Sequence, residues 1–315
     1  HSGEVACDHY HRFREDVALM KKMGVQGYRF SINWSRVFPN GTGTVNEKGL
    51  KFYHELVDEL CAANIEPYIT LYHWELPYEL YKKGGWMNRE IVEWFSDYAA
   101  FIAKEFSDKV THFFTVNEPQ CFIGLGYMTG VHAPGLKVPV RDTFLMAHHV
   151  LMAHGMAVKK MRQTARRDIL IGIAPTGSMS YPDSERPEDI EAARMHLMQV
   201  NPDLQNWTWN VTWWSDPIFR GEYPEDGLRL YKDYLPTMTP EDMKLISQPI
   251  DFYGQNIYNG NRIRMGKDGK PEVVKRYDGF PKTALGWPVT PECLYWGPYF
   301  LYERYQSPIY ITENG

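Results

Sequence analysis

Two short segments and the helical pattern between them decide the fold: EPYITLYHW at residues 66–74, an amphipathic stretch at about 88–107, and THFFTVNEP at 111–119. Branched and aromatic residues dominate both short segments, which is typical of buried strands. A strand, a helix and a second strand in this order form a βαβ unit, in which the two strands run parallel. The stretch therefore predicts a parallel sheet covered by helices.

The same unit recurs along the chain. The expected strands are 28–32, 66–74, 111–119, 169–175, 250–258 and 309–315, and the expected helices are 8–24, 46–64, 88–107, 141–166, 240–247 and 291–305. Thr239-Pro240 and Thr290-Pro291 predict two helix starts, each with threonine as the N-cap and proline at the first helical position. Regular βα alternation predicts one (β/α) barrel domain over residues 1–315. A doubly wound sheet is the alternative, but no glycine-rich phosphate loop follows any strand.

Composition limits the classes of partner. A formal net charge of −5 and scattered lysines and arginines give no basic field for nucleic acid or an anionic membrane, and no apolar run approaches 18 residues. The four cysteines lack metal-site spacing, and the clustered histidines, among them His148, His149 and His154, lack the spacing of a metal site. We therefore expect no metal and no cofactor. The 10 tryptophans and 21 tyrosines suit a large core and also stacking against sugar rings.

Polar side chains gather at the predicted carboxyl ends of the strands, where barrels build their active sites. They are Arg29, His73, Trp74, Asn117, Glu118, Asn256, Tyr258 and Glu313. Two carboxylic acids among amide, imidazole, phenol, guanidinium and indole groups suit a neutral polyhydroxy ligand. Glycoside hydrolysis requires two such acids, one protonated and one ionised.

Seven motifs occur in an order that resembles glycoside hydrolase family 1, the retaining β-glucosidase family. They are CDHYHRF, YRFSINWSR, LYHWELP, TVNEP (115–119), GVHAPG, FRGEYPE and ITENG (311–315). The resemblance implies a (β/α)8 TIM barrel that hydrolyses terminal β-D-glucosides through a covalent glycosyl-enzyme. It implies that Glu118 is the general acid/base and Glu313 the nucleophile.

The resemblance also assigns the substrate contacts. Asn117 is expected to contact the sugar 2-hydroxyl and His73 another ring hydroxyl, while Arg29 and Tyr258 flank the nucleophile. Trp74 is expected to serve either as a stacking platform or as part of the core, and Asn256 is a further expected substrate contact. Trp34, Trp213 and Trp214 are expected in the core.

The two glutamates are expected to have different charges. Arg29 and Tyr258 favour the ionised form of Glu313, whose negative charge in turn raises the pKa of Glu118. For a retaining mechanism, the two carboxyl groups are expected to lie about 5 Å apart.

Two positions depart from commoner family sequences: Gln120 replaces tryptophan, and Glu75 replaces aspartate. Gln120 makes the leaving-group preference uncertain, whereas Glu75 is interpreted as structural. The first and last strands of the family barrel are expected to lie outside the chain, so that about six of the eight are present. A fragment of this kind is expected to be inactive or barely active alone.

The alternative function is a non-catalytic sugar-binding protein, although such relatives usually lose one glutamate. The substrate is expected to be a small β-glycoside and the location cytoplasmic. The sequence does not predict an oligomeric state.

Overall fold

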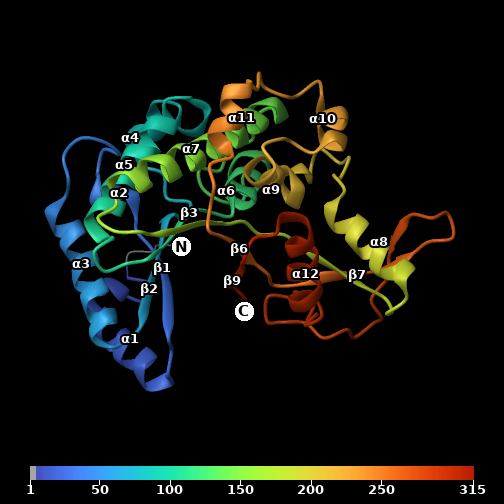
Figure 1. Ribbon diagram of the computed structural model, residues 1–315, viewed down its shortest axis with the longest axis horizontal. Helices are drawn as coiled ribbons and strands as arrows, with labels where there is room; N and C mark the ends of the chain where they lie inside the picture. The colour runs from blue at the N-terminus through green and yellow to red at the C-terminus, as the bar shows by residue number, and fades with distance from the viewer. Residues whose placement is uncertain (1–4) are drawn as a thin grey trace. The chain divides into compact units, whose positions relative to one another are not determined.

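The computed structural model describes residues 5–315 (Figure 1). The chain divides into two compact units, one formed by residues up to 117 with 157–172 and the other by 118–156 with 173–315. Helix α7 (Val140–Thr164) and strand β4 (Leu170–Ala174) each have residues in both. The two units are described separately.

The first unit contains three parallel strands and the helices between them. Its elements are α1 (His9–Met23), β1 (Gly27–Ser31), α2 (Trp34–Val37), α3 (Glu47–Ala62), β2 (Glu66–Tyr72), α4 (Tyr78–Lys82), η1 (Gly85–Met87), α5 (Ile91–Phe106) and β3 (His112–Asn117). Strand β1 pairs with β2 from Gly27↔Glu66, and β2 pairs with β3 from Tyr68↔His112, both in parallel. The predicted parallel sheet is thus confirmed in this unit.

Aromatic side chains fill the core of the first unit. Trp34 is 1% exposed, stacks on Tyr98 with ring centroids 5.0 Å apart, and donates its indole N–H to the Gly41 carbonyl at 2.9 Å. The satisfied N–H allows the large ring to be buried without an unpaired polar group. The prediction that Trp34 belongs to the core is confirmed.

The second unit contains the remaining strands. Its elements are α6 (Pro119–Ile123), η2 (Gly124–Met128), β5 (Met179–Pro182), α8 (Pro187–Met198), η3 (Trp207–Trp209), α9 (Val211–Phe219), α10 (Glu225–Tyr231), α11 (Pro240–Ile246), β6 (Phe252–Asn256), β7 (Gly260–Met265), β8 (Pro271–Val273), α12 (Cys293–Tyr305) and β9 (Ile309–Glu313). Strand β6 pairs in parallel with β9, and the Asn256 N–H donates to the Pro175 carbonyl just after β4 at 2.9 Å. The buried Trp213 and Trp214 confirm two further core predictions.

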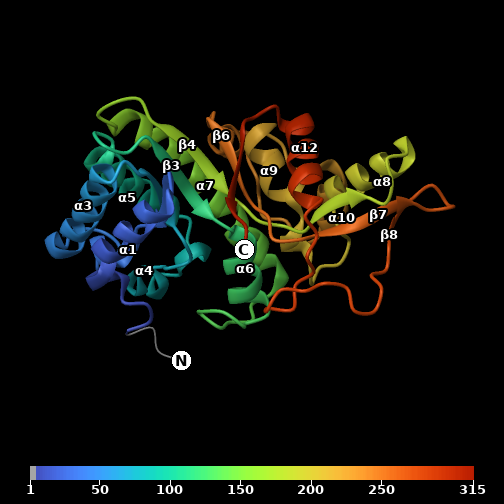
Figure 2. The same cartoon turned by 90° about the horizontal axis from the view of Figure 1, so that it is seen from below.

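A small second sheet, in the order β5-β7-β8, lies beside α8 (Figure 2). Strand β7 pairs in parallel with β5 and, through a tight turn, antiparallel with β8. Helix α8 packs along β7, and α12 packs along β5. This sheet holds α8 beside β7.

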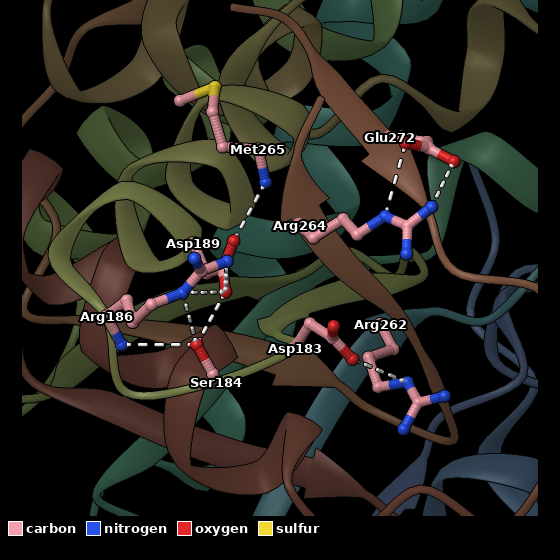
Figure 3. A network of polar contacts seen from close by, with 8 residues as sticks. All are labelled: Asp183, Ser184, Arg186, Asp189, Arg262, Arg264, Met265 and Glu272. Atoms are coloured by element: carbon pink, nitrogen blue, oxygen red, sulfur yellow. Dashed lines mark hydrogen bonds and ion pairs between the residues drawn. The ribbon is translucent and has the colours of Figure 1, made fainter. Parts of the chain in front are cut away.

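A buried carboxylate joins α8 to β7 (Figure 3). One Asp189 oxygen accepts the Met265 backbone N–H at 2.9 Å, and the other accepts the Ser184 hydroxyl at 2.5 Å and Arg186 at 3.0 Å. Two further ion pairs lie beside β7: Arg262 with Asp183, and Arg264 with Glu272. The hydrogen bond from Ser184 is the main reason that the pKa of Asp189 lies below its ordinary value.

The two predicted threonine caps have different outcomes. Thr239 caps α11 in a full capping box with Asp242, as predicted. The prediction for Thr290 is wrong, because α12 begins only at Cys293, after Glu292. The Thr290 hydroxyl instead accepts the Gly260 N–H at 2.8 Å, so it fixes the start of β7.

The clustered histidines of α7 are packed into the protein interior. In the second unit, His148 Nδ1 bonds to the Tyr223 hydroxyl at 3.0 Å, and its Nε2 lies 3.4 Å from Asp242 on α11. His154 is fully buried, and burial lowers its pKa to about 3. Among residues 5–315, no helix is both long enough and apolar enough to cross a bilayer.

Candidate active site

Glu118 adopts an unusual backbone conformation. Strand β3 ends at Asn117, α6 begins at Pro119, and Glu118 between them has φ 43° and ψ 66°. A left-handed conformation is uncommon for glutamate, and such strain costs about 1–3 kcal/mol where the surrounding structure holds it. Its side chain is only 5% exposed. A strained, buried carboxyl group is typical of a functional site.

Contacts within the second unit set the protonation of Glu118. Burial is the main cause that raises its pKa, and the negative charge of Glu313 raises it further. Hydrogen bonds from Asn256, at 2.7 Å, and from Cys121 and Thr176 oppose the rise, but the pKa remains above its ordinary value. The predicted direction is therefore confirmed, with burial as the larger cause.

Asn256, at the end of β6, bonds both to Glu118 and to the strand that carries Glu313. Its Nδ2 donates to Glu118, and its Oδ1 accepts the Thr312 hydroxyl at 2.5 Å. Thr312 directly precedes Glu313 on β9. Asn256 is fully buried and both ends of its amide are engaged, so it can hold Glu118 in place. Its predicted contact with substrate stays a prediction.

Glu313 is held at the end of β9 by the segment that follows β6. The Tyr258 hydroxyl donates to the Glu313 carboxylate, as predicted. The Ile257 N–H donates to the Glu313 carbonyl at 2.9 Å, and Asn314 Nδ2 donates to the Ile257 carbonyl at 2.7 Å. Glu118 and Glu313 are thus both bonded to residues 256–258. This shared attachment supports the prediction of nearby carboxyl groups, although their 5 Å separation stays a prediction.

The other predicted site residues lie in the first unit. Arg29 on β1 donates to the Thr70 hydroxyl at 2.9 Å and to Asn117 Oδ1 at 3.2 Å. Asn117 Nδ2 lies 3.1 Å from His73 Nε2. Because the guanidinium can only donate, it fixes the Asn117 oxygen and directs the NH₂ group to His73. The predicted contact between Arg29 and Glu313 stays a prediction.

Trp74 is not fully buried, unlike the core tryptophans. It is half-buried, and its indole N–H donates to the Asn117 carbonyl at 3.1 Å. Its φ of 81° makes it, like Glu118, a non-glycine residue in the left-handed region. Trp74 therefore anchors the end of β3, and its face stays a predicted sugar contact.

Three residues that contact Glu118 or Asn256 were not predicted from the sequence: Cys121, Thr176 and Thr312. Cys121 lies three residues after Glu118, in the first turn of α6, the helix for which Glu118 is the N-cap residue. Gln120 is buried and bonds the Thr176 backbone, with its Nε2 2.9 Å from the Thr176 carbonyl. Gln120 therefore ties α6 to the segment that follows β4.

We predict that Cys121→Ala shifts the alkaline limb of the kcat/KM profile to higher pH. The thiol bond lowers the pKa of Glu118, so its removal leaves Glu118 protonated up to a higher pH. Burial keeps the thiol itself neutral. Cys293→Ala, which removes another buried thiol, is the matched control and should leave the limb in place. An unmoved limb in Cys121→Ala would contradict the assignment.

Comparison with known proteins decides the family. The model of glycosyl hydrolase family 1 matches residues 1–315. The chain belongs to glycosyl hydrolase family 1. The resemblance stated from the motifs is confirmed, and the chain is a glycoside hydrolase by family.

Individual relatives agree with this membership. The chain is 44% identical over 316 residues to a 1,4-beta-D-glucan glucohydrolase of Thermotoga neapolitana, covering 100% of this chain and 72% of the relative. It is 44% identical over 321 residues to beta-glucosidase A of Acetivibrio thermocellus, covering 100% of this chain and 69% of the relative.

Solved structures of the family give the fold. A beta-glucosidase from Thermotoga maritima in complex with castanospermine matches with a TM-score of 0.85 at 42% identity, over 100% of this chain and 68% of that one. A complex of the beta-glucosidase from that organism with glucoimidazole also scores 0.85, at 43% identity, over 100% of this chain and 69% of that one. The predicted fold class, an α/β TIM barrel with about six strands in this chain, is confirmed.

Proposed function

We propose that this family member hydrolyses terminal β-D-glucosides with retention of configuration, with Glu313 as nucleophile and Glu118 as general acid/base. Relatives named beta-glucosidase and glucan glucohydrolase support the substrate class. The observation that carries the roles is the different environment of the two carboxyl groups. Glu118 is buried with a raised pKa, whereas Glu313 receives a phenol hydrogen bond from Tyr258.

In the first step, a Glu313 oxygen attacks the anomeric carbon and the bond to the leaving oxygen breaks. Glu118 transfers its proton to that oxygen, which departs as an alcohol. The products are a glycosyl ester on Glu313 and an ionised Glu118. Burial is the main cause of the raised pKa of Glu118, and ester formation removes the additional contribution from the negative charge of Glu313.

In the second step, Glu118 acts as the base. The hydrogen bonds from Asn256, Cys121 and Thr176 remain and stabilise its ionised form. Glu118 takes a proton from water, the water oxygen attacks the anomeric carbon, and the ester bond to Glu313 breaks. The free sugar leaves with its original configuration, and both carboxyl groups return to their starting states.

The stereochemical outcome tests this proposal. We predict that 4-nitrophenyl β-glucoside yields β-glucose as the first product, observed by proton NMR before mutarotation. Two successive displacements at one carbon, each with inversion, restore the configuration. First formation of α-glucose would contradict the retaining mechanism. The NMR assay uses the natural protein.

The partner is proposed to be a small β-glycoside. The related beta-glucosidase from Thermotoga maritima binds the small molecules castanospermine and glucoimidazole. Location in the cytoplasm stays a prediction, which fractionation of the source cells tests.

A further inference from the structure

The pairing of β6 with β9 contains a β-bulge directly before the proposed nucleophile. The two strands lie side by side and run parallel (Figure 1). Gln255 is opposite Ile311. Asn256, the next residue of β6, is opposite Glu313. The register therefore advances by one residue on β6 and by two on β9, and Thr312 is the extra residue. Bulges are common beside active sites, where they redirect a side chain.

The bulge allows two successive side chains of β9 to bond to one short segment. In a regular strand, such neighbours point to opposite faces of the sheet. Here the Thr312 hydroxyl donates to Asn256 Oδ1 at 2.5 Å, and the next residue, Glu313, accepts the Tyr258 hydroxyl. Asn256 and Tyr258 are only two residues apart. The extra residue thus places a hydroxyl group beside the Asn256 amide.

The backbone of Asn256 is fixed by the segment that follows β4. Its N–H donates to the Pro175 carbonyl at 2.9 Å, and its carbonyl accepts the Thr176 hydroxyl at 3.3 Å. The whole residue is buried. With the backbone held, the important remaining freedom of Asn256 is a half-turn of its amide, which exchanges Oδ1 and Nδ2.

A half-turn of the amide would reverse the contact with Glu118. In the observed orientation, Asn256 Nδ2 donates to Glu118 at 2.7 Å, and an ionised carboxylate can only accept. The reverse orientation would place Oδ1 against the carboxyl group, where it can only accept a proton that Glu118 carries. The observed orientation therefore favours ionised Glu118, and the reverse orientation favours protonated Glu118.

The three side chains form a hydrogen-bond chain with one direction. The Thr312 hydroxyl donates to the amide oxygen of Asn256, and the amide NH₂ group donates to Glu118. Donation to the oxygen polarises the amide and strengthens its N–H groups as donors. The chain therefore stabilises negative charge on Glu118, and Thr312 also supplies a donor to the buried amide oxygen.

We propose that Thr312 is a positioning residue, whose hydroxyl holds the Asn256 amide with its NH₂ group toward Glu118. This inference rests on the proposed function, in which Glu118 is the general acid/base. It gives the strand that carries the nucleophile a second role, because the residue before Glu313 controls the acid/base group through Asn256.

The other groups that act on Glu118 do not include Thr312 itself. Burial is the largest cause of its raised pKa, and the bond from Asn256 is the largest opposing cause. The titratable groups that act on it from the elements packed around it are Glu313 on β9 and Cys121 on α6. Replacement of the uncharged Thr312 leaves these groups in place, so it acts on Glu118 through the amide.

The experiment compares Thr312→Val with Thr312→Ser in the natural protein, by the pH profile of kcat/KM for 4-nitrophenyl β-glucoside. Without the hydroxyl, ionised Glu118 is less stable and its pKa rises. We therefore expect the alkaline limb of Thr312→Val to move up by about half a pH unit to one unit. Thr312→Ser keeps the hydroxyl and should keep the limb in place. Thr237→Val, at an exposed threonine between α10 and α11, is the matched control.

A purely structural role for Thr312 predicts the opposite order of the two variants. Valine has nearly the shape of threonine and suits a strand better than serine does. Packing alone would therefore make Thr312→Ser the more damaging change. An unmoved limb in Thr312→Val, or equal shifts in both variants, would overturn the inference.

The route through the amide is tested in an Asn256→Ala background. If Thr312 acts on Glu118 through Asn256, adding Thr312→Val should move the limb no further. Additive shifts would refute this route, because Thr312 would then act on Glu118 without the amide. The melting temperature of each variant checks that it is folded.

The proposed function and the role of Thr312 fail in different ways. If the unsubstituted protein leaves β-glucosides intact, the proposed function fails. Carbon-13 NMR of the glutamate carboxyl groups then still tests Thr312, since it measures the pKa of Glu118 without catalysis. The signal absent from Glu118→Gln identifies Glu118. A higher midpoint in Thr312→Val than in Thr312→Ser supports the inference, and equal midpoints refute it.

Discussion

Glu313→Gln is expected to lower kcat by at least about 10⁴-fold on every β-glucoside, whatever its leaving group. The amide is a poor nucleophile, so no glycosyl ester forms and the second step has no substrate. The Tyr258 hydroxyl, which donates to the carboxylate, can still donate to the amide oxygen. Loss of activity would therefore reflect the missing nucleophile more than a disrupted arrangement of the site residues.

The measurement is kcat on 4-nitrophenyl and 2,4-dinitrophenyl β-glucosides, with the melting temperature as a check on folding. Glu225→Gln is the matched control, because that glutamate is 94% exposed on α10 and should leave kcat unchanged. A Glu313→Gln variant that retains more than about 1% of the activity on the better leaving group would refute the nucleophile assignment.

Local sequence patterns predicted most of the strands and helices. The strand at 111–119 is observed as β3 at His112–Asn117, and the helix at 88–107 as α5 at Ile91–Phe106. Alternation of branched and aromatic residues is a local property, so it can be read without knowledge of the fold. Thr290 was misassigned because its hydroxyl bonds to Gly260, thirty residues earlier, and no local pattern reveals that partner.

The two carboxylic acids and the contact of Tyr258 with Glu313 were predicted, but the bonds of Asn256 to Glu118 and Thr312 were not. The amide of Asn256 reaches Glu118 across 138 positions of sequence and Thr312 across 56. Such contacts depend on which strand ends meet, which is decided by the whole sheet. The role of Gln120 was likewise visible only in the structure, where its buried side chain bonds the backbone of Thr176.

Glu118→Gln is expected to separate substrates by their leaving group. An alkyl glucoside needs a proton on the departing oxygen, so its kcat/KM should fall by about 10²–10⁴-fold. 2,4-Dinitrophenol leaves as a stable anion without that proton, so glycosylation of Glu313 by this substrate should be nearly unchanged. Asn256 can still donate to the amide oxygen of the variant, which favours retained geometry.

The same variant should be slow in the second step, because no carboxylate takes the proton from water. With 2,4-dinitrophenyl β-glucoside we therefore expect a burst of dinitrophenol equal to the enzyme concentration, then slow turnover while the glycosyl ester persists. Azide should restore turnover and form β-glucosyl azide, since this anion attacks without losing a proton. Equal losses on alkyl and dinitrophenyl glucosides, measured as kcat/KM, would contradict the acid/base role. In that case Glu118, strained and buried at the end of β3, would be a structural residue whose raised pKa has no part in proton transfer.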